Sequence, residues 1–233
     1  MIGIIGAMQV EIDTLIHSMI SRQTMEFGKN IYTMGEIAGQ KVVVVCSGIG
    51  KVNATIAATT LIHKFATTTI INIGVAGGVG ENIKIGDIVL ATSCVQFDVV
   101  VDSTNGGKIG LVDKLDSIYI DCDSRLVNKI KTSIEICGKP FRLGVVATSD
   151  KFITNPKILK DIKKLCDPEA VEMESGAIAQ VCHLYKIPFT TIRTISDTAD
   201  EKAEGDFATN MKATAQTSCN IITNYLSTLS IDF

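Results

Sequence analysis

Short apolar runs of strand length alternate with segments of helical periodicity along this 233-residue chain. Such alternation is typical of a sheet that is covered by helices on its faces. The turn residues Ala38-Gly39-Gln40 predict a hairpin between two of the runs. The pattern predicts strands at Ile2–Ala7, Ile31–Ile37, Lys41–Ser47, Thr68–Gly74, Asp87–Cys94, Arg142–Ala147, Ala170–Glu172 and Pro188–Ile195.

Apolar residues recur at helical spacing in further segments and predict amphipathic helices. Residues 98–123 lack any periodicity, and Ser103-Thr104-Asn105-Gly106-Gly107 predicts a surface loop there. We therefore expect an α/β fold of a single domain, residues 1–233, with a central mixed, mostly parallel sheet flanked by helices. The helical stripes are Ile12, Leu15, Ile16 and Met19; Leu126, Val127, Ile130 and Ile134; Ala177, Ile178 and Val181; and Met211, Ala215, Cys219, Ile222, Leu226 and Leu229.

Composition and charge exclude several classes of protein. Lys and Arg total 22 against 25 Asp and Glu, and the net charge of −3 has the wrong sign for binding a nucleic-acid backbone. The uncharged stretch 213–231 is long enough for a membrane span, but its many Thr, Ser and Asn residues favour an amphipathic helix. No basic region precedes the apolar run Ile2–Met8, so a signal peptide is not predicted and the cytoplasm is the expected location.

Metal and disulfide chemistry also lack a sequence signature. The seven Cys form no Cys-x-x-Cys pair, and none of His17, His63 and His183 lies at ligand spacing from another. We expect reduced, mostly buried thiols, no metal and no cofactor. Any catalytic chemistry would then depend on carboxylates.

Two glycine-rich segments follow predicted strands. They are Gly74-Val75-Ala76-Gly77-Gly78 and Ser47-Gly48-Ile49-Gly50-Lys51, the second of which precedes a helix. Glycine lets a backbone approach a ligand closely, and ligands bind at the carboxyl ends of strands in open α/β sheets. Neither segment matches a nucleotide fingerprint. The segment that begins at Gly74 lacks the G-x-G-x-x-G order, and in the second segment Val52 stands where a P-loop needs Ser or Thr. They either bind another ligand or only form tight turns.

Three acidic residues lie in apolar surroundings at strand ends. Glu11 begins the first helix and shares a face with Ile12 and Leu15, so its carboxylate is expected to face the core side. Glu174 follows a short strand, and Asp197 ends an apolar one. For Glu11 the alternative is an acid that only complements the helix dipole.

Arg193 is the one charge inside its predicted strand. A buried charge is costly unless it is paired, so Arg193 is expected to meet Glu172, Glu174 or Asp197. An ion pair that only stabilises the structure is the alternative.

Several motifs occur together nearly end to end along the chain: Ile2-Gly3-Ile4-Ile5-Gly6-Ala7-Met8 with Glu11, Ser47-Gly48-Ile49-Gly50-Lys51-Val52, Ala76-Gly77-Gly78, Gly86-Asp87-Ile88-Val89, Val171-Glu172-Met173-Glu174 and Arg193-Thr194-Ile195-Ser196-Asp197. In combination they resemble the 5′-methylthioadenosine/S-adenosylhomocysteine nucleosidase family of the nucleoside phosphorylase superfamily. The resemblance implies the nucleoside phosphorylase-like fold and hydrolysis of the bond that joins adenine to the ribose of a 5′-thio-substituted adenosine. Such cleavage passes through an oxocarbenium-like transition state.

The resemblance also implies roles for individual residues. Asp197 would protonate the purine and would need a raised pKa or a relay, with Ser196 positioning it. Glu11 would deprotonate the attacking water, and Glu174 would take the ribose hydroxyls. For Phe152, which matches an adenine-stacking position, a core role is the alternative. The substrate-binding positions implied are Met8, Ala76, Gly77, Phe152, Ile153, Glu172, Met173, Arg193, Ser196 and Phe207.

The chain departs from the family pattern in two places. Val75 stands where the family usually has Ser or Thr, and Phe97-Asp98-Val99-Val100 stands where it has His-Asp-x-Asp. The resemblance implies a homodimer in which the partner's 98–113 loop closes the pocket for the 5′ substituent. The preferred substituent therefore stays open among methylthioadenosine, adenosylhomocysteine, 5′-deoxyadenosine and aminodeoxyfutalosine.

Three other functions remain as alternatives. An aminodeoxyfutalosine nucleosidase would differ only at the 5′ side. A purine nucleoside phosphorylase would need cations for phosphate, but the chain has only Arg22, Arg125, Arg142 and Arg193, and Met8-Gln9-Val10-Glu11 contains none. A nucleoside-binding protein without catalysis would not need the three acids together.

Overall fold

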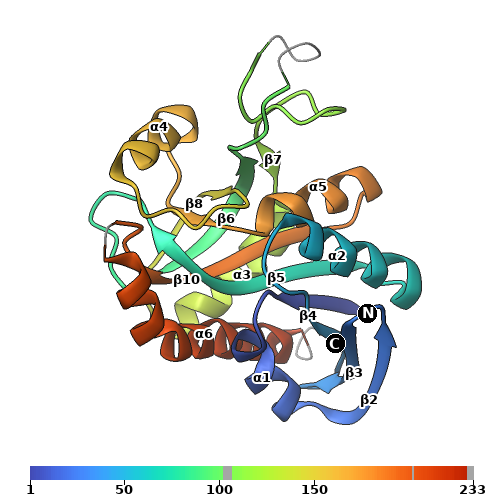
Figure 1. The fold of residues 1–233 in the computed structure, drawn as a ribbon. Coiled ribbons are helices and arrows are strands. Elements are labelled where there is room, and N and C mark those ends of the chain that lie inside the picture. The colour runs from blue at the N-terminus through green and yellow to red at the C-terminus, as the bar shows by residue number, and fades with distance from the viewer. Residues whose placement is uncertain (102–106, 201, 230–233) are drawn as a thin grey trace.

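The computed structural model describes residues 1–101, 107–200 and 202–229. One large sheet runs through it, with helices on both sides (Figure 1). The strands are β1 (Ile2–Gly6), β2 (Ile20–Phe27), β3 (Asn30–Ile37), β4 (Gln40–Cys46), β5 (Thr69–Gly78), β6 (Ile88–Gln96), β7 (Ile120–Asp121), β8 (Phe141–Thr148), β9 (Ala170–Glu172) and β10 (Phe189–Asp197). The helices are α1 (Gln9–Ser18), α2 (Lys51–Phe65), α3 (Ser124–Ile136), α4 (Pro156–Cys166), α5 (Ser175–Tyr185) and α6 (Ala203–Thr228).

Strand β5 is the centre of the sheet. It pairs with β1, β9 and β10, and the strands β5, β10, β6, β8 and β9 close into a ring. From β1 the sheet continues through β4, β3 and β2. Among the described residues parallel and antiparallel pairings are equally frequent, so the sheet is mixed as predicted but has no parallel majority.

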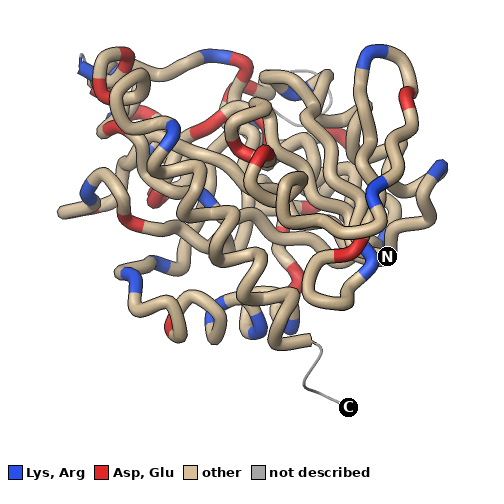
Figure 2. The backbone as a smooth tube through the Cα atoms, turned by 90° about the horizontal axis from the view of Figure 1, so that it is seen from below, with Lys and Arg blue, Asp and Glu red and all other residues tan. Residues whose placement is uncertain are grey.

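The helices form two layers. Helices α2 and α5 pack together on one side, with the His63 and Tyr185 rings 4.9 Å apart, and α1 and α3 pack against α6 on the other (Figure 1). Strands covered on both faces carry continuous apolar runs, and Val42–Val45 is fully buried for this reason. Basic and acidic residues are interspersed along the backbone (Figure 2). None of the described helices combines the length and hydrophobicity needed to cross a membrane.

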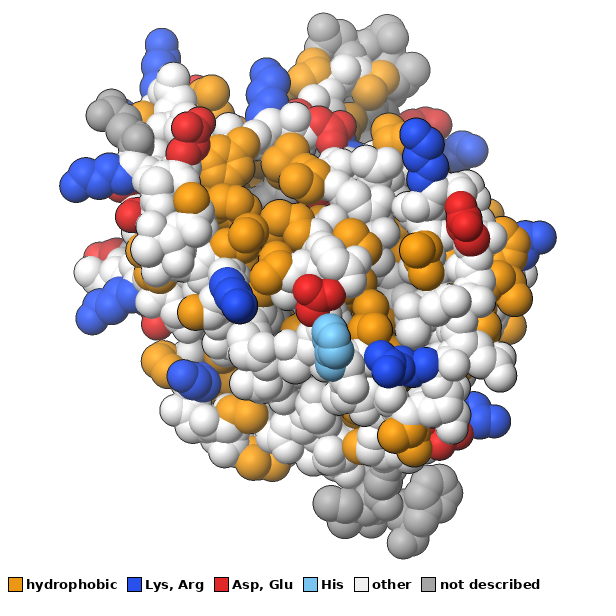
Figure 3. Space-filling view, turned by 60° about the horizontal axis from the view of Figure 1, so that its bottom comes forward, with side chains coloured by type: hydrophobic (Ala, Val, Ile, Leu, Met, Phe, Trp, Pro, Cys, Tyr) orange, Lys and Arg blue, Asp and Glu red, His pale blue; other side chains and the backbone are white. Residues whose placement is uncertain are grey.

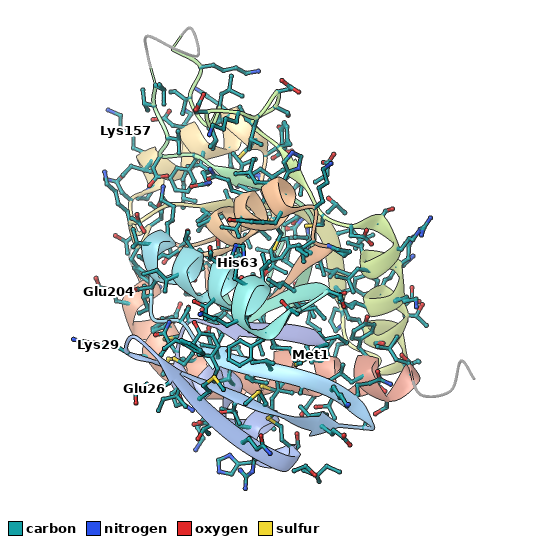
Figure 4. The ribbon with its side chains drawn as sticks, turned by 90° about the vertical axis from the view of Figure 1, so that its right-hand side faces the viewer. Met1, Glu26, Lys29, His63, Lys157 and Glu204 are labelled. Carbon is teal, nitrogen blue, oxygen red and sulfur yellow. The ribbon has the colours of Figure 1, made fainter. Side chains whose placement is uncertain are left out.

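Every predicted strand is present, β9 with its predicted bounds and the others with shifted ends, and the structure adds β2 and β7. Strand β2 is exposed along almost its whole length, so no buried face imposes a pattern of alternating residues. At its hairpin end Glu26 and Lys29 point outward (Figure 4). Helix α4 was also not predicted, although Ile158, Ile162 and Leu165 recur along it at helical spacing.

Two local predictions need correction. Gly74–Gly78 is not a loop after the strand but the end of β5, which pairs there with β9 and β10. Met19 follows α1 in extended conformation, although its side chain is buried as the stripe predicted. The predicted loop at 103–107 lies outside the described residues except for Gly107.

Candidate active site

A cavity of about 350 Å³ opens where β1, β5, β9 and β10 end. Carboxyl ends of strands are the usual ligand position in open α/β folds. Every predicted site residue except Arg193 lines this cavity. The wall also contains Ala7, Ile49, Val75, Lys151 and Val171, which were not among the predicted site residues. Figure 3 shows hydrophobic side chains gathered around a hollow on one face of the molecule.

Glu11 is held by backbone amides at the start of α1. Its Oε2 accepts hydrogen bonds from the N–H groups of Ala7 (2.7 Å) and Met8 (2.9 Å), and its Oε1 accepts one from Val75 (3.0 Å). Burial raises the pKa of Glu11, while the charge of Arg193 and the three amides oppose the rise. The carboxylate therefore combines a fixed orientation with an increased affinity for a proton.

Gly74 makes room for this arrangement in the middle of β5. A β-carbon at this position would overlap Nη1 of Arg193 and would lie 2.6 Å from Oε1 of Glu11. A side chain here would therefore separate the acid from the guanidinium. The glycine is required by the site and not by a turn.

Arg193 lies behind the cavity wall and, unlike the other predicted substrate-binding residues, does not line the cavity. Its side chain is 1% exposed. The guanidinium donates hydrogen bonds to Asn72 Oδ1, to Ser175 Oγ (2.9 Å) and to the Val75 carbonyl (3.4 Å). A buried guanidinium needs such partners, and they draw it into the core.

Glu172 is the principal charge partner of Arg193, at 2.5 Å between Oε2 and Nη2. The same oxygen accepts hydrogen bonds from the backbone N–H groups of Glu174 (2.9 Å) and Ser175 (2.8 Å) at the start of α5. Its other oxygen accepts a hydrogen bond from Thr148. Internal donors thus surround a carboxylate that also lines the cavity, and it caps the positive end of a helix.

Glu174 occupies the N-cap of α5 and faces the cavity. Its Oε1 accepts a hydrogen bond from the Gly50 amide (2.9 Å), and its Oε2 lies 3.7 Å from Nη2 of Arg193. Burial and the neighbouring charge of Glu172 raise its pKa to about 8, although Arg193 and the Gly50 amide act in the opposite direction. Oε2 has no closer contact than this ion pair among the described residues, so it is the oxygen available to a ligand.

Asp197 ends β10 on the wall of the same cavity. Its Oδ1 accepts a hydrogen bond from the Ala199 amide (2.9 Å), and its Oδ2 accepts one from Ser196 Oγ (2.8 Å). Burial raises the pKa of Asp197, and these hydrogen bonds limit the rise. A carboxyl group with a raised pKa is suited to donate a proton.

Two aromatic rings close one part of the cavity. Phe152 and Phe207 lie edge to face with 5.8 Å between ring centroids, and both line the wall. Phe152 is 44% exposed, so it does not belong to the core, whereas Ile153 beside it is buried. Flat apolar surfaces of this kind suit a planar ring such as a nucleobase.

The Glu172–Arg193 pair predicts a large loss of stability when it is broken. Glu172→Gln places an amide N–H₂ among donors and leaves Arg193 without its 2.5 Å partner. We expect the free energy of unfolding to fall by about 3–5 kcal/mol in urea titrations. Glu135→Gln breaks the exposed Lys131–Glu135 pair and should change it by less than about 1 kcal/mol. Equal effects of the two substitutions would contradict this prediction.

The three acids Glu11, Glu174 and Asp197 thus share one cavity but have different hydrogen-bond partners. Carboxyl groups in different environments can divide the roles of acid, base and charge stabiliser in glycoside cleavage. In the described part of the chain, no group of three or more His, Cys, Asp or Glu residues is placed to hold a metal ion.

Comparisons with known proteins identify the family to which the chain is similar. The family model of the phosphorylase superfamily matches residues 1–227. A 5′-methylthioadenosine/S-adenosylhomocysteine nucleosidase of Shewanella denitrificans is 41% identical over 208 residues, which cover 88% of this chain and 90% of the relative. The crystal structure of the nucleosidase of that name from Neisseria meningitidis, in complex with methylthio-immucillin-A, superimposes with a TM-score of 0.94 at 35% identity, covering 97% and 98% of the two chains. A futalosine hydrolase of Helicobacter pylori superimposes with a TM-score of 0.92 at 29% identity, covering 97% of each chain.

Proposed function

This chain belongs to the 5′-methylthioadenosine/S-adenosylhomocysteine nucleosidases of the phosphorylase superfamily, and we propose that Glu11, Glu174 and Asp197 are the catalytic residues of its cavity. The enzyme is a hydrolase that cleaves the bond between adenine and the 5′-substituted ribose. The observation that carries the assignment of residues is the meeting of three buried acids on one cavity wall.

Asp197 is the general acid in this proposal. Departure of adenine requires a proton on the base, and burial keeps the pKa of Asp197 above its ordinary value. Ser196 orients the carboxyl group through the 2.8 Å hydrogen bond to Oδ2. Phe152, Ile153, Ala76 and Gly77 form the neighbouring wall, where the adenine ring would lie.

Glu11 is the general base that activates water. Its two oxygens are fixed by three amides, and Arg193 lies close behind Oε1 across Gly74. A base in a fixed orientation brings the bound water into line with the sugar carbon. Arg193 therefore acts as a positioning residue behind the site and not as a contact to substrate.

Glu174 stabilises the ribose as positive charge develops on it. Its Oε2 is free to accept hydrogen bonds from ribose hydroxyls, and Met173 packs beside it on the wall. Negative charge near an oxocarbenium ion lowers the barrier, and Glu174 supplies that charge as the pH rises through its pKa of about 8. Met8 and Phe207 would cover the 5′ side, and Glu172 would hold Glu174 and Arg193 in place.

Adenine release without phosphate tests the hydrolase activity against the phosphorylase alternative. No Arg among the described residues lines the cavity, and the acid Glu11 would repel phosphate. We expect the rate of adenine release from methylthioadenosine to be equal, within about twofold, without phosphate and at saturating phosphate. A strict requirement for added phosphate, with ribose 1-phosphate as product, would contradict the proposal.

The proposal covers several substituents at the 5′ end of the substrate. Methylthioadenosine and adenosylhomocysteine are the proposed substrates, with 5′-deoxyadenosine and aminodeoxyfutalosine differing only at that end. Val75 brings an apolar side chain to the wall, and Lys151 is the one cation on the described wall. Adenine release from the four compounds under one set of conditions would rank them.

A homodimer is part of the proposal. Val52 and Ile56, four residues apart at the start of α2, are 70% and 50% exposed, and Ile49, which precedes the helix, is 52% exposed. An exposed apolar stripe of this kind favours burial by a second copy. Because Ile49 also lines the cavity, the partner's 98–113 loop would then lie near the 5′ end. We further propose that residues 1–233 act as one domain and that the enzyme is cytoplasmic.

A further inference from the structure

The carboxylate of Asp98 joins two segments of the cavity wall, although Asp98 itself does not line the cavity. We propose that Asp98 is a positioning residue that fixes Glu174 and the Phe152 segment in their working geometry. The inference rests on the function proposed above, because it assigns Asp98 to the hydrolysis carried out in that cavity. It does not depend on the partner subunit.

Both oxygens of Asp98 are engaged, each with a different segment. Oδ1 lies 2.7 Å from Nζ of Lys51, the first residue of α2. Oδ2 accepts a hydrogen bond from the Asp150 amide (3.0 Å), which directly precedes the wall residues Lys151 and Phe152. One side chain, two residues after β6, therefore connects the start of α2 with the segment after β8.

Asp150 closes the connection from the other side. Its Oδ1 accepts a hydrogen bond from the backbone N–H of Lys51 (2.8 Å). Asp98, Asp150 and Lys51 thus form a closed set of three hydrogen bonds, which we term the Asp98 clasp. Such a set resists displacement of any one member more than a single bond does.

The clasp reaches the reaction through the residue before Lys51. The Gly50 amide donates the 2.9 Å hydrogen bond to Oε1 of Glu174. Gly50 has a φ of 98°, a conformation that side chains rarely adopt, and Asp150 Oδ1 would lie only 3.1 Å from a β-carbon there. The peptide that holds Glu174 is therefore fixed by the clasp.

Partial burial gives the Lys51–Asp98 pair more weight than a surface ion pair. The two side chains are 18% and 23% exposed, against 40% and 51% for Lys131 and Glu135. The short distance and the ionic partners make this a strong hydrogen bond. The elements that it joins are loop ends around the cavity, so its loss should alter the cavity more than the core.

Steady-state kinetics of four variants test the proposal with methylthioadenosine as substrate. We expect Asp98→Ala to lower kcat/KM about tenfold, mainly through a higher KM, because both segments lose their common anchor. Asp98→Asn keeps one acceptor and should recover part of the loss, and Lys51→Met should lose less than Asp98→Ala. The double variant Asp98→Ala/Lys51→Met should equal Asp98→Ala, because Asp98→Ala already removes the only interaction that Lys51→Met takes from the clasp.

Arg142→Ala is the matched control, since it breaks the part-buried Arg142–Glu169 pair (3.3 Å), neither member of which lines the cavity. It should leave kcat/KM within twofold, with a change in melting temperature similar to that of Asp98→Ala. The proposal is overturned if Asp98→Ala stays within twofold of wild type or lowers kcat/KM no more than the control does. If Asp98→Ala does not fold, the test uses Asp98→Asn and Lys51→Met instead. A kcat/KM within twofold of wild type in both of these variants overturns the proposal.

The wild-type enzyme in the same assay separates this inference from the function on which it rests. A wild type that releases no adenine contradicts the proposed function. In that case calorimetric binding of methylthioadenosine to wild type and Asp98→Ala still tests the clasp. A tenfold weaker affinity in the variant supports the clasp, and equal affinities overturn it.

Discussion

Asp197→Asn is expected to lower kcat for adenine release about 10³-fold while methylthioadenosine still binds. The asparagine amide has nearly the same shape, and its oxygen can still accept a hydrogen bond from the Ala199 amide. It cannot transfer a proton to the departing base, and loss of a general acid typically costs 10²–10⁴ in rate. Burial raises the pKa of Asp197, so the wild-type rate should fall as the pH rises through that value.

Single-turnover adenine release and calorimetric binding, measured on the same preparation, provide the test. Asp200→Asn is the matched control, because Asp200 lies three residues further on and accepts hydrogen bonds from Thr198 and the Lys202 amide without lining the cavity. Its kcat should stay within about twofold of wild type. If the wild type bound methylthioadenosine but released no adenine, the binding-protein alternative would replace the enzyme. A near-normal rate in Asp197→Asn would assign the proton to another group.

The three acids could be predicted from sequence because their positions carry a clear signal. Each lies at the end of an apolar strand or at the start of the helix that follows, where a charge is unusual unless it is used. The sheet was predictable for a related reason, since strands such as β4 and β5 are covered on both faces and contain continuous apolar runs. Exposed β2 lacked that signal.

The support behind the acids could not be predicted, because its members are distant in sequence. Asn72 and Thr148 appear as ordinary polar residues of buried strands until the fold places them against Arg193 and Glu172. The place of Arg193 behind the cavity wall could not be predicted for the same reason. Its charge predicted a partner, but no local pattern distinguishes a guanidinium that lines a cavity from one that lies behind it.

Glu11→Gln is expected to lower kcat by a factor of about 10²–10⁴ and to abolish the acidic limb of the pH profile. Glutamine cannot take a proton from water, and one end of its amide becomes a donor that faces the backbone N–H groups of Ala7, Met8 or Val75. Asp13→Asn changes an acid two residues further along α1 that does not line the cavity, and it should leave kcat within about twofold.

The pH profile makes the role of Glu11 specific. Burial raises its pKa above the ordinary 4.5, so wild-type kcat/KM should fall with decreasing pH in a limb centred above pH 4.5, as Glu11 gains a proton and can no longer accept one from water. Glu11→Gln removes the titrating group, and its low residual rate should not show that limb. If kcat of Glu11→Gln falls by the expected factor but its pH profile keeps the acidic limb, another carboxylate activates the water. Because burial also raises the pKa of Glu174, to about 8, Glu174→Gln measured in parallel would identify a limb that belongs to it.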